Sequence, residues 1–169
     1  MPAKRANQNR PAARPRVPRT ALRDYTYLDF VALYDLDQVC YPRGIAYSKR
    51  ELRWFLSQAG ALCIVAEIGS AIAGFLIADR ENHVAHIITI DVAPAYRRRG
   101  VGTQMIREIE RRLAALGVNE INLETAANSE AGTGFWLRHG YRTIGVMPGY
   151  YLGRQDALAM QKLLPDSRE

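Results

Sequence analysis

The spacing of apolar side chains changes along the chain, and the first region is helical in character. Leu22–Asp24 is a predicted short strand, and a helix is predicted over Tyr27–Val39 because apolar residues recur there every three or four positions. The residues that define this apolar face are Leu28, Val31, Ala32 and Leu36. Ser48 begins a second predicted helix, since Glu51 completes a capping box with it and an apolar stripe follows as far as Gly60.

After Gly60 the spacing changes to the short period that is typical of strands. Three strands are predicted in succession, and the Gly69-Ser70 pair between the first two indicates a hairpin turn. These strands span Leu62–Ile68, Ala71–Asp79 and Val84–Val92.

The rest of the chain alternates helices with strands. Helices are predicted over Val101–Leu116 and Asn128–His139, and strands over Ile121–Thr125, Tyr141–Met147 and Ala157–Leu164. A helix that connects two parallel strands of one sheet crosses over in the right-handed sense. We therefore expect a mixed α/β fold with a central, mixed, mostly antiparallel sheet and flanking helices.

Length and composition fit one domain with its own core. The chain has 169 residues, of which 48% are hydrophobic and 24% are charged. Its longest charge-free apolar run, Ile68–Ala78, is about half of the roughly 18 to 20 residues that a membrane-spanning helix requires. No membrane association is therefore expected.

The net charge of +6 belongs to the first 19 residues, which hold six Lys or Arg and no acid. We expect residues 1–19 to form a disordered basic tail and residues 20–169 to form the folded domain. Because that domain is electrically balanced, contact with nucleic acid is expected only through the tail. Cys40 and Cys63 lie far apart without a CxxC spacing, which indicates reduced thiols, a cytoplasmic protein and no metal site.

The segment after the strand Val84–Val92 carries the strongest chemical signal. Three arginines, Arg97–Arg99, and two glycines, Gly100 and Gly102, stand directly before a predicted helix. Free amides at a helix N-terminus and glycines that admit a ligand close to the main chain are suited to pyrophosphate. The spacing is not that of GxxxxGK[ST], and Met105 stands where dinucleotide folds need a third glycine. From the residues alone, a solvated Arg-Gly turn is the other interpretation.

The motif Arg97-x-x-Gly100-x-Gly102 after Ile90-Asp91-Val92 resembles the coenzyme A signature of the GNAT acetyltransferases, and the order of elements resembles that fold. The resemblance is closest to N-terminal acetyltransferases, both the RimI-type enzymes that act on ribosomal proteins and the eukaryotic Nα-acetyltransferase catalytic subunits. The further stretches that support it are Leu36–Pro42, Asn122–Glu124, Gly149–Tyr151 and Asp156-Ala157.

The resemblance implies acetyl-CoA as the cosubstrate and no metal. Backbone groups of Ile90 and Val92 are expected to pair with the pantetheine arm as if it were an added strand. Main-chain amides in the turn would hold the pyrophosphate, and Asn128 would contact the arm. The expected coenzyme-binding residues are Ile90, Asp91, Val92, Arg97, Arg98, Arg99, Gly100, Val101, Gly102, Thr103 and Asn128.

The same resemblance implies two catalytic residues. Glu124 takes the catalytic-carboxylate position of the bacterial enzymes, where it would accept the amine proton through a water. His86 stands ten residues before Tyr96, where the eukaryotic subunits place a catalytic Tyr, while Glu124 takes the place of their catalytic His. A swapped His–Glu pair is one interpretation, and a core histidine with a structural surface glutamate is the other.

Four further residues match the loops that grip the first residues of a peptide: Tyr41, Pro42, Tyr150 and Tyr151. As an alternative, such tyrosines fill a core or favour strands. Trp136 departs from the RimI pattern, which has a tyrosine four residues before Gly140 to protonate the leaving thiolate. An indole cannot do so, which leaves water or one of the two C-terminal tyrosines as the donor, or a thiolate that departs unprotonated.

The expected activity is acetyl transfer from acetyl-CoA to a protein or peptide N-terminal α-amine, with a ribosomal protein as a candidate substrate, by direct attack in a ternary complex. A lysine or small-molecule amine acetyltransferase is one alternative, although the balanced charge gives no sign of a site for a polycation. An inactive acyl-CoA-binding module is the other, and Trp136 is the feature that favours it.

Overall fold

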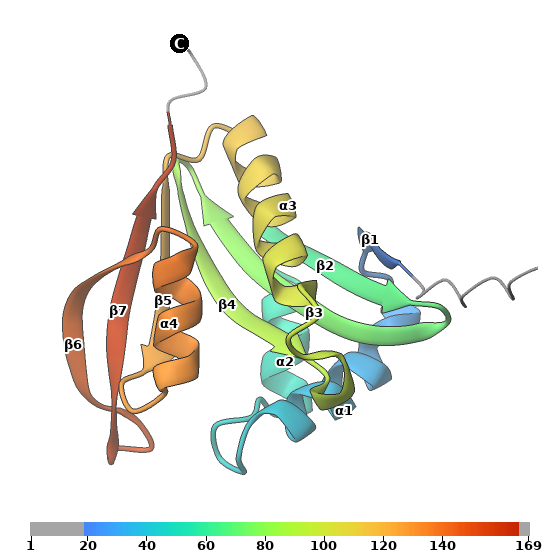
Figure 1. The fold of residues 1–169 in the computed structure, drawn as a ribbon, viewed down its shortest axis with the longest axis horizontal. Coiled ribbons are helices and arrows are strands. Elements are labelled where there is room, and N and C mark those ends of the chain that lie inside the picture. Colours follow the sequence, from blue (N-terminus) through green and yellow to red (C-terminus); the bar gives the residue numbers. More distant parts are fainter. Residues whose placement is uncertain (1–18, 166–169) are drawn as a thin grey trace, which may run out of the picture.

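The computed structural model describes residues 19–165 as one seven-stranded sheet with helices on both faces (Figure 1). Residues 1–18 of the predicted tail lie outside the described residues. The strands are β1 (Thr20–Asp24), β2 (Ala61–Ile68), β3 (Ala71–Glu81), β4 (Val84–Val92), β5 (Glu120–Ala126), β6 (Arg142–Tyr151) and β7 (Gln155–Leu163). The helices are α1 (Phe30–Cys40), α2 (Lys49–Leu56), α3 (Val101–Ala115) and α4 (Glu130–Arg138).

The strands lie in the order β1-β2-β3-β4-β5-β7-β6. Every neighbouring pair is antiparallel except β4 and β5, which are parallel and connected by α3. The predicted mixed sheet and its strand–helix–strand crossover are therefore confirmed. The last strand, β7, lies between β5 and β6.

Helix α3 covers one face of the sheet with the apolar side that its sequence predicts. Met105, Ile109 and Leu113 are fully buried in the larger apolar cluster, whereas Leu116 lies just after the helix and is 49% exposed. Burial of such side chains contributes roughly 1.5 to 3 kcal/mol each. The helix is therefore anchored firmly, with its N-terminus close to the end of β4 (Figure 1).

Helices α1 and α2 cover the other face. The capping box of α2 is present, because Ser48 N donates to Glu51 Oε2 at 2.8 Å and Glu51 N donates to Ser48 Oγ at 3.3 Å. Helix α1 turns a different side inward from the predicted one, since Leu28 and Val31 are 75% and 62% exposed. Its buried residues are Phe30, Leu33 and Asp37. This inner face includes an acid, which a search for apolar residues excludes.

Several element boundaries differ from the prediction. A 3-10 turn, Tyr27–Asp29, precedes α1. Ser129 caps α4 by accepting a hydrogen bond from Gly132 N at 3.1 Å, so the helix begins at Glu130 and Asn128 lies outside it. Strand β6 continues to Tyr151, which places the C-terminal tyrosine pair on the β6–β7 hairpin.

Strands β4 and β5 separate after a short paired stretch. The paired positions are Val84 with Glu120, Ala85 with Ile121 and His86 with Asn122. Beyond them the register of β4 with β3 skips Ile88, and such a bulge bends and twists its strand. The two strands then diverge (Figure 1), which leaves one edge of β4 from Ile88 to Val92 without a neighbouring strand. Within residues 19–165, no helix is both long and apolar enough to span a membrane.

Candidate active site

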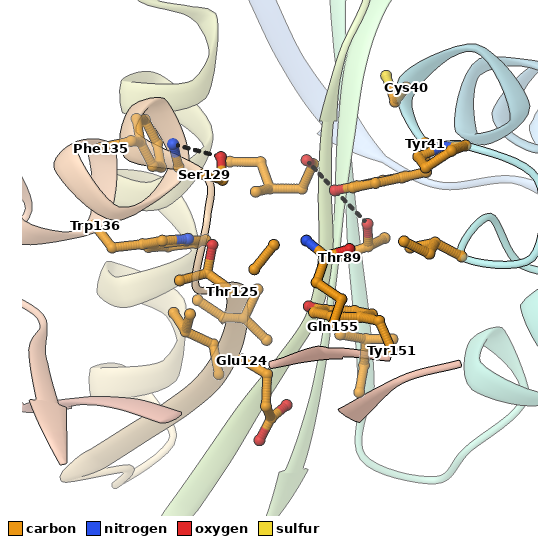
Figure 2. A pocket seen from close by; sticks show the side chains of 18 of the residues that line it. Cys40, Tyr41, Thr89, Glu124, Thr125, Ser129, Phe135, Trp136, Tyr151 and Gln155 are labelled. Carbon is orange, nitrogen blue, oxygen red and sulfur yellow. Dashed lines mark hydrogen bonds between the residues drawn. The ribbon is translucent and has the colours of Figure 1, made fainter. Parts of the chain in front are cut away.

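The diverging strands open into a cavity of about 460 Å³. The α1–α2 loop forms one wall, and β5 with α4 forms the other, as Figure 2 shows. The cavity brings together six residues that were predicted for three different roles: Tyr41, Pro42, Ile90, Glu124, Asn128 and Tyr151.

The two predicted catalytic side chains touch at the point where the strands separate. Nε2 of His86 lies 2.7 Å from Oε2 of Glu124, and the hydroxyl of Tyr150 lies 3.5 Å from the same oxygen. His86 occupies the last paired position of β4, and Glu124 follows two residues after its partner Asn122. The Glu124 side chain is mostly buried at 19% exposure, and that of His86 is 39% exposed. A carboxylate and an imidazole in contact beside a cavity are able to accept and pass on a proton.

Helix α3 starts at an uncapped glycine. Gly100 is its N-cap with φ of +80°, and no side chain caps the first turn. The amides of Val101, Gly102 and Thr103 therefore have no partner within the helix, and they carry the positive end of its dipole. Arg98 also has a left-handed φ of +59°, and alternation of left-handed and helical residues forms the concave amide nest that binds anions.

Gly102 has a packing role as well as a predicted coenzyme role. A Cβ at this position would lie 3.2 Å from the ring of Phe135 and 3.8 Å from Ile90. The glycine therefore lets α4 approach α3 and the end of β4 closely.

The three arginines of the turn differ in their contacts. Arg97 Nε donates to the carbonyl of Val92 at 2.9 Å, and the Arg99 guanidinium lies over the ring of Tyr96 at 5.7 Å. Arg98 and Arg99 are exposed beside the amide nest. They add positive charge near it, while the main chain supplies the directed donors.

The carbonyl groups along the open edge of β4 each accept a hydrogen bond. The donors are Tyr47 to Ile88 at 3.2 Å, Tyr41 to Ile90 at 3.1 Å, and Arg97 to Val92 at 2.9 Å. A backbone carbonyl has two lone pairs, so those of Ile88 and Ile90 are still able to accept from an extended ligand, whereas that of Val92 also accepts from Cys40 Sγ at 3.5 Å. The predicted pairing of β4 with the pantetheine arm therefore stays a prediction that the free edge allows.

Tyr47 lines the cavity although the sequence interpretation did not include it. Two residues of α1 hold its main chain: Tyr47 N donates to Asp37 Oδ2 at 2.7 Å, and Gln38 Nε2 donates to Tyr47 O at 2.9 Å. Burial raises the pKa of Asp37 to about 6, against the hydrogen bonds that its carboxylate accepts from Tyr47 N and from Gln38 Nε2. No signal in the sequence indicated this contact, because the apolar pattern did not identify the face of α1 on which Asp37 lies.

Asp91 is fully buried, and its carboxyl does not line the cavity. Oδ1 lies 2.6 Å from Thr89 Oγ1, and Oδ2 has no hydrogen-bond partner among the described residues. Burial, and secondarily the nearby Asp37, raises the pKa of Asp91 to about 8 against the hydrogen bond with Thr89. The side chain is therefore placed behind the cavity wall rather than toward a coenzyme.

Asn128 and the C-terminal tyrosines lie around the β5 side of the cavity. Asn128 Oδ1 accepts a hydrogen bond from Gln155 Nε2 at 2.5 Å, which ties the start of α4 to β7. Tyr150 and Tyr151 pack edge to face, and burial raises the pKa of Tyr151 to about 12. Tyr151 lines the cavity, and Tyr150 lies closer to Glu124.

Trp136, at the position where the resemblance led us to expect a tyrosine, lines the cavity. Its ring packs edge to face against Phe135 and Tyr141 and is almost fully buried. Figure 2 shows its indole directed into the cavity from α4. An indole N–H donates a hydrogen bond but does not protonate a thiolate.

Comparison with known proteins agrees with this geometry. The model of the acetyltransferase (GNAT) family matches residues 30–141, which is most of the chain. The chain belongs to the GNAT family. A GNAT-type relative, an uncharacterised N-acetyltransferase of Methanocaldococcus jannaschii, is 30% identical over 62% of this chain and 67% of its own length.

Two solved GNAT-type structures share the fold. The ribosomal-protein-S18-alanine N-acetyltransferase of Escherichia coli has a TM-score of 0.80 at 20% identity, over 89% of this chain and 99% of that one. A GNAT family acetyltransferase of Elizabethkingia anophelis with acetyl-CoA bound has a TM-score of 0.73 at 16% identity, over 86% and 98%. The family match and the named relative make this chain an N-acetyltransferase of the GNAT family, a family that uses acetyl-CoA.

The residues of this GNAT chain fit acetyl-CoA. The uncapped amides at Gly100 suit a pyrophosphate, and the free edge of β4 suits an arm that carries amide groups. The cavity at the end of this edge leads to Glu124. When bound, acetyl-CoA would supply an activated acetyl group to this cavity.

Proposed function

We propose that this GNAT enzyme acetylates the N-terminal α-amine of a protein or peptide, with ribosomal proteins among the candidates, in the cytoplasm. The observation that carries the proposal is the His86–Glu124 contact of 2.7 Å, in which Glu124 lines a cavity walled by the α1–α2 loop and His86 stands beside it. The Escherichia coli enzyme with the same fold is named for an N-terminal alanine of ribosomal protein S18, which supports this acceptor class.

The chemistry requires only a mild base. An α-amine has a pKa near 8, against about 10.4 for a lysine side chain, so a large share of it is neutral at physiological pH. In the proposed step the amine nitrogen attacks the acetyl carbon, and the amine proton moves to Glu124 directly or through a water. His86 then shares this proton across its contact with Glu124. The carbon–sulfur bond of the donor breaks as the carbon–nitrogen bond becomes an amide.

The cavity walls favour a peptide over a polycationic small molecule. Among the described residues that line the cavity, Glu124 is the only acid, and most of the others are apolar or neutral. Pro42 and Tyr151 offer an uncharged wall for a first side chain, and Tyr150 offers a hydroxyl for a peptide backbone. A site for polyamines would be expected to carry several carboxylates.

The test is an acetylation assay on short peptides that vary at their first two residues and carry one internal lysine. With acetyl-CoA, the full chain is expected to add one acetyl group to the α-amine, located by fragment-ion mass spectrometry. The matched control is the same peptide with a blocked N-terminus, which is expected to stay unmodified. Acetylation of the lysine alone, or of neither amine while CoA still binds, would contradict the proposal.

A further inference from the structure

Trp136 stands where the resemblance to RimI-type enzymes implies a tyrosine that protonates the departing thiolate. An indole cannot protonate it, so the proton donor of this enzyme has to be another group. Apart from the His86–Glu124 pair, a series of hydroxyl groups connects the buried acid Asp91 with the cavity. Oδ1 of Asp91 lies 2.6 Å from Thr89 Oγ1, and Thr89 Oγ1 lies 3.3 Å from Tyr41 Oη. Tyr41 Oη lies 3.1 Å from the carbonyl oxygen of Ile90, on the open edge of β4 (Figure 2).

The number of hydrogens on each group limits the directions that these hydrogen bonds are able to take. The carbonyl of Ile90 only accepts, so the Tyr41 hydroxyl donates to it. Thr89 has one hydrogen, which it is able to donate either to Asp91 or to Tyr41; if it donates to Tyr41, the contact of 2.6 Å with Asp91 is a hydrogen bond only when Asp91 donates. All three contacts are satisfied together only when the Asp91 carboxyl is protonated.

The surroundings of Asp91 favour the protonated form. Its second oxygen, Oδ2, is buried without a partner, which is costly for a carboxylate and mild for a neutral acid. Burial, with the nearby Asp37, raises the pKa of Asp91 to about 8, although hydrogen bonding with Thr89 and Tyr41 and the charge of Arg97 act in the opposite direction. The titratable groups that face it from α1, the following loop, β2 and the turn before α3 are Asp37, Cys40, Tyr41, Tyr47, Cys63 and Arg97.

We propose that Tyr41 is the acid for the leaving thiolate, and that Thr89 and Asp91 replace its proton. As the carbon–sulfur bond breaks, the thiolate takes the Tyr41 proton, Tyr41 takes one from Thr89, and Thr89 takes one from Asp91, which becomes a carboxylate. Solvent returns a proton to Asp91 before the next turnover. This inference rests on the proposed function only for acetyl transfer from acetyl-CoA and not for the identity of the acceptor amine.

The position of Tyr41 along β4 suits this role. The amide nest of α3 lies next to the Val92 end of β4. Glu124 lies across the cavity from the other end of this edge, at Ile88. An arm that follows this edge from the nest toward Glu124 passes Ile90, where the Tyr41 hydroxyl points into the cavity. The thiol at the tip of such an arm would therefore lie on the same side as this hydroxyl.

The first test measures steady-state kinetics of the full chain with acetyl-CoA and any amine that it acetylates. Tyr41→Phe and Thr89→Val are expected to lower kcat by about tenfold or more, on the order of general-acid losses, with KM for acetyl-CoA within about twofold. Thr133→Val is the matched control, because it removes a buried hydroxyl that has no partner in the structure and does not line the cavity. Its kcat is expected to stay unchanged. A wild-type kcat in Tyr41→Phe or in Thr89→Val would overturn the proposal.

The second test follows the proton itself. Carbon-13 NMR of Asp91 in the full chain is expected to show a protonated carboxyl at pH about 7 that titrates near pH about 8. Asp91→Asn still donates a hydrogen bond to Thr89 but passes on no proton, so kcat is expected to fall about tenfold and its decline above pH about 8 to disappear. An ionised Asp91 at neutral pH, or a wild-type kcat in Asp91→Asn, would overturn the proposed proton transfer from Asp91 through Thr89 to Tyr41.

These outcomes are separable from those of the proposed function. If the enzyme acetylates only lysine, the α-amine proposal fails while the kinetic test of Tyr41 still applies, because the leaving thiol is the same. If no acceptor is found, the NMR titration alone decides whether Asp91 holds a proton. Thermal unfolding of each variant shows whether a loss of kcat reflects a loss of folded protein.

Discussion

Glu124 and His86 form a pair whose members approach from two strands that have just separated. Neither strand alone would place a base beside the acetyl donor, because successive side chains of a strand alternate between its faces. The contact of 2.7 Å holds the carboxylate toward the imidazole, and Tyr150 limits its movement from the β6–β7 hairpin. The pair is therefore positioned before a substrate arrives.

Replacing Glu124 with Gln is expected to lower kcat at least about tenfold, because an amide does not accept the amine proton. Steady-state acetylation of a peptide measures the change. The matched control is Glu120→Gln on the same strand, where the carboxylate accepts from Asn122 at 2.7 Å, its one side-chain partner within residues 19–165, and lies outside the cavity. Equal kcat for both variants and the wild type would remove Glu124 from the mechanism.

The site residues that the sequence indicated are those carried by a contiguous motif. Glu124 and the glycine turn stand in short stretches whose spacing is diagnostic, so they could be found without a structure. Tyr47 and Thr89 could not, because their importance depends on which backbone carbonyl of β4 lies opposite them. Asp91 was assigned to the coenzyme from its place in the motif, yet its carboxyl points behind the wall.

The first turn of α3 depends on a backbone conformation that side chains disfavour. Gly100→Ala is expected to weaken CoA binding by about tenfold, because relief of the left-handed strain of roughly 1 to 2 kcal/mol would turn the first amides away. A Cβ there meets only Gln104 at 4.0 Å, so the fold should tolerate it. Calorimetric titration with CoA measures the effect.

Gly69→Ala is the matched control for that experiment. Gly69 also has a positive φ, +64°, and has nothing within 4 Å of an added Cβ, but it lies in the β2–β3 hairpin away from the nest. It is expected to lose similar stability and keep its affinity for CoA. If the two variants bind CoA equally well, the amide nest is not the binding site.

Helices α1 and α3 show where prediction from pattern succeeds and where it stops. Apolar residues alone define the inner face of α3, so its period identifies that face correctly. The inner face of α1 includes Asp37, which is buried because it accepts the Tyr47 amide, and no local pattern announces such a partner ten residues away. Likewise, the order of strands after β5 could not be derived, because short loops allow either β6 or β7 beside it.

The two buried acids make the stability of the folded chain depend on pH. The folded-state pKa values of Asp91, about 8, and Asp37, about 6, lie above their unfolded values near 3.8. The native state therefore binds more protons than the unfolded state above pH about 4, and the free energy of unfolding should fall as pH rises toward about 8. Asp29 and Glu108 have lowered pKa values, about 2, and titrate below this window.

Urea denaturation at pH about 5, about 6.5 and about 8 measures this slope. The wild type is expected to lose stability at each step, whereas Asp91→Asn should change little between the two higher values. Asp37→Asn should chiefly flatten the lower part of the range. A wild-type curve that is flat between pH about 5 and about 8 would contradict the burial of these acids in protonated form.

The insertion of β7 between β5 and β6 has a consequence for synthesis of the chain on the ribosome. Strand β5 meets β4 at three positions only, whereas it meets β7 along its whole length, from Glu120 opposite Leu163 to Ala126 opposite Ala157. Until residues 155–163 have left the exit tunnel, the ribbon that bears Glu124 lacks most of its backbone partners. A nascent chain would therefore hold its donor-binding half before its reactive half is braced, and acetylation would require that β7 has already emerged.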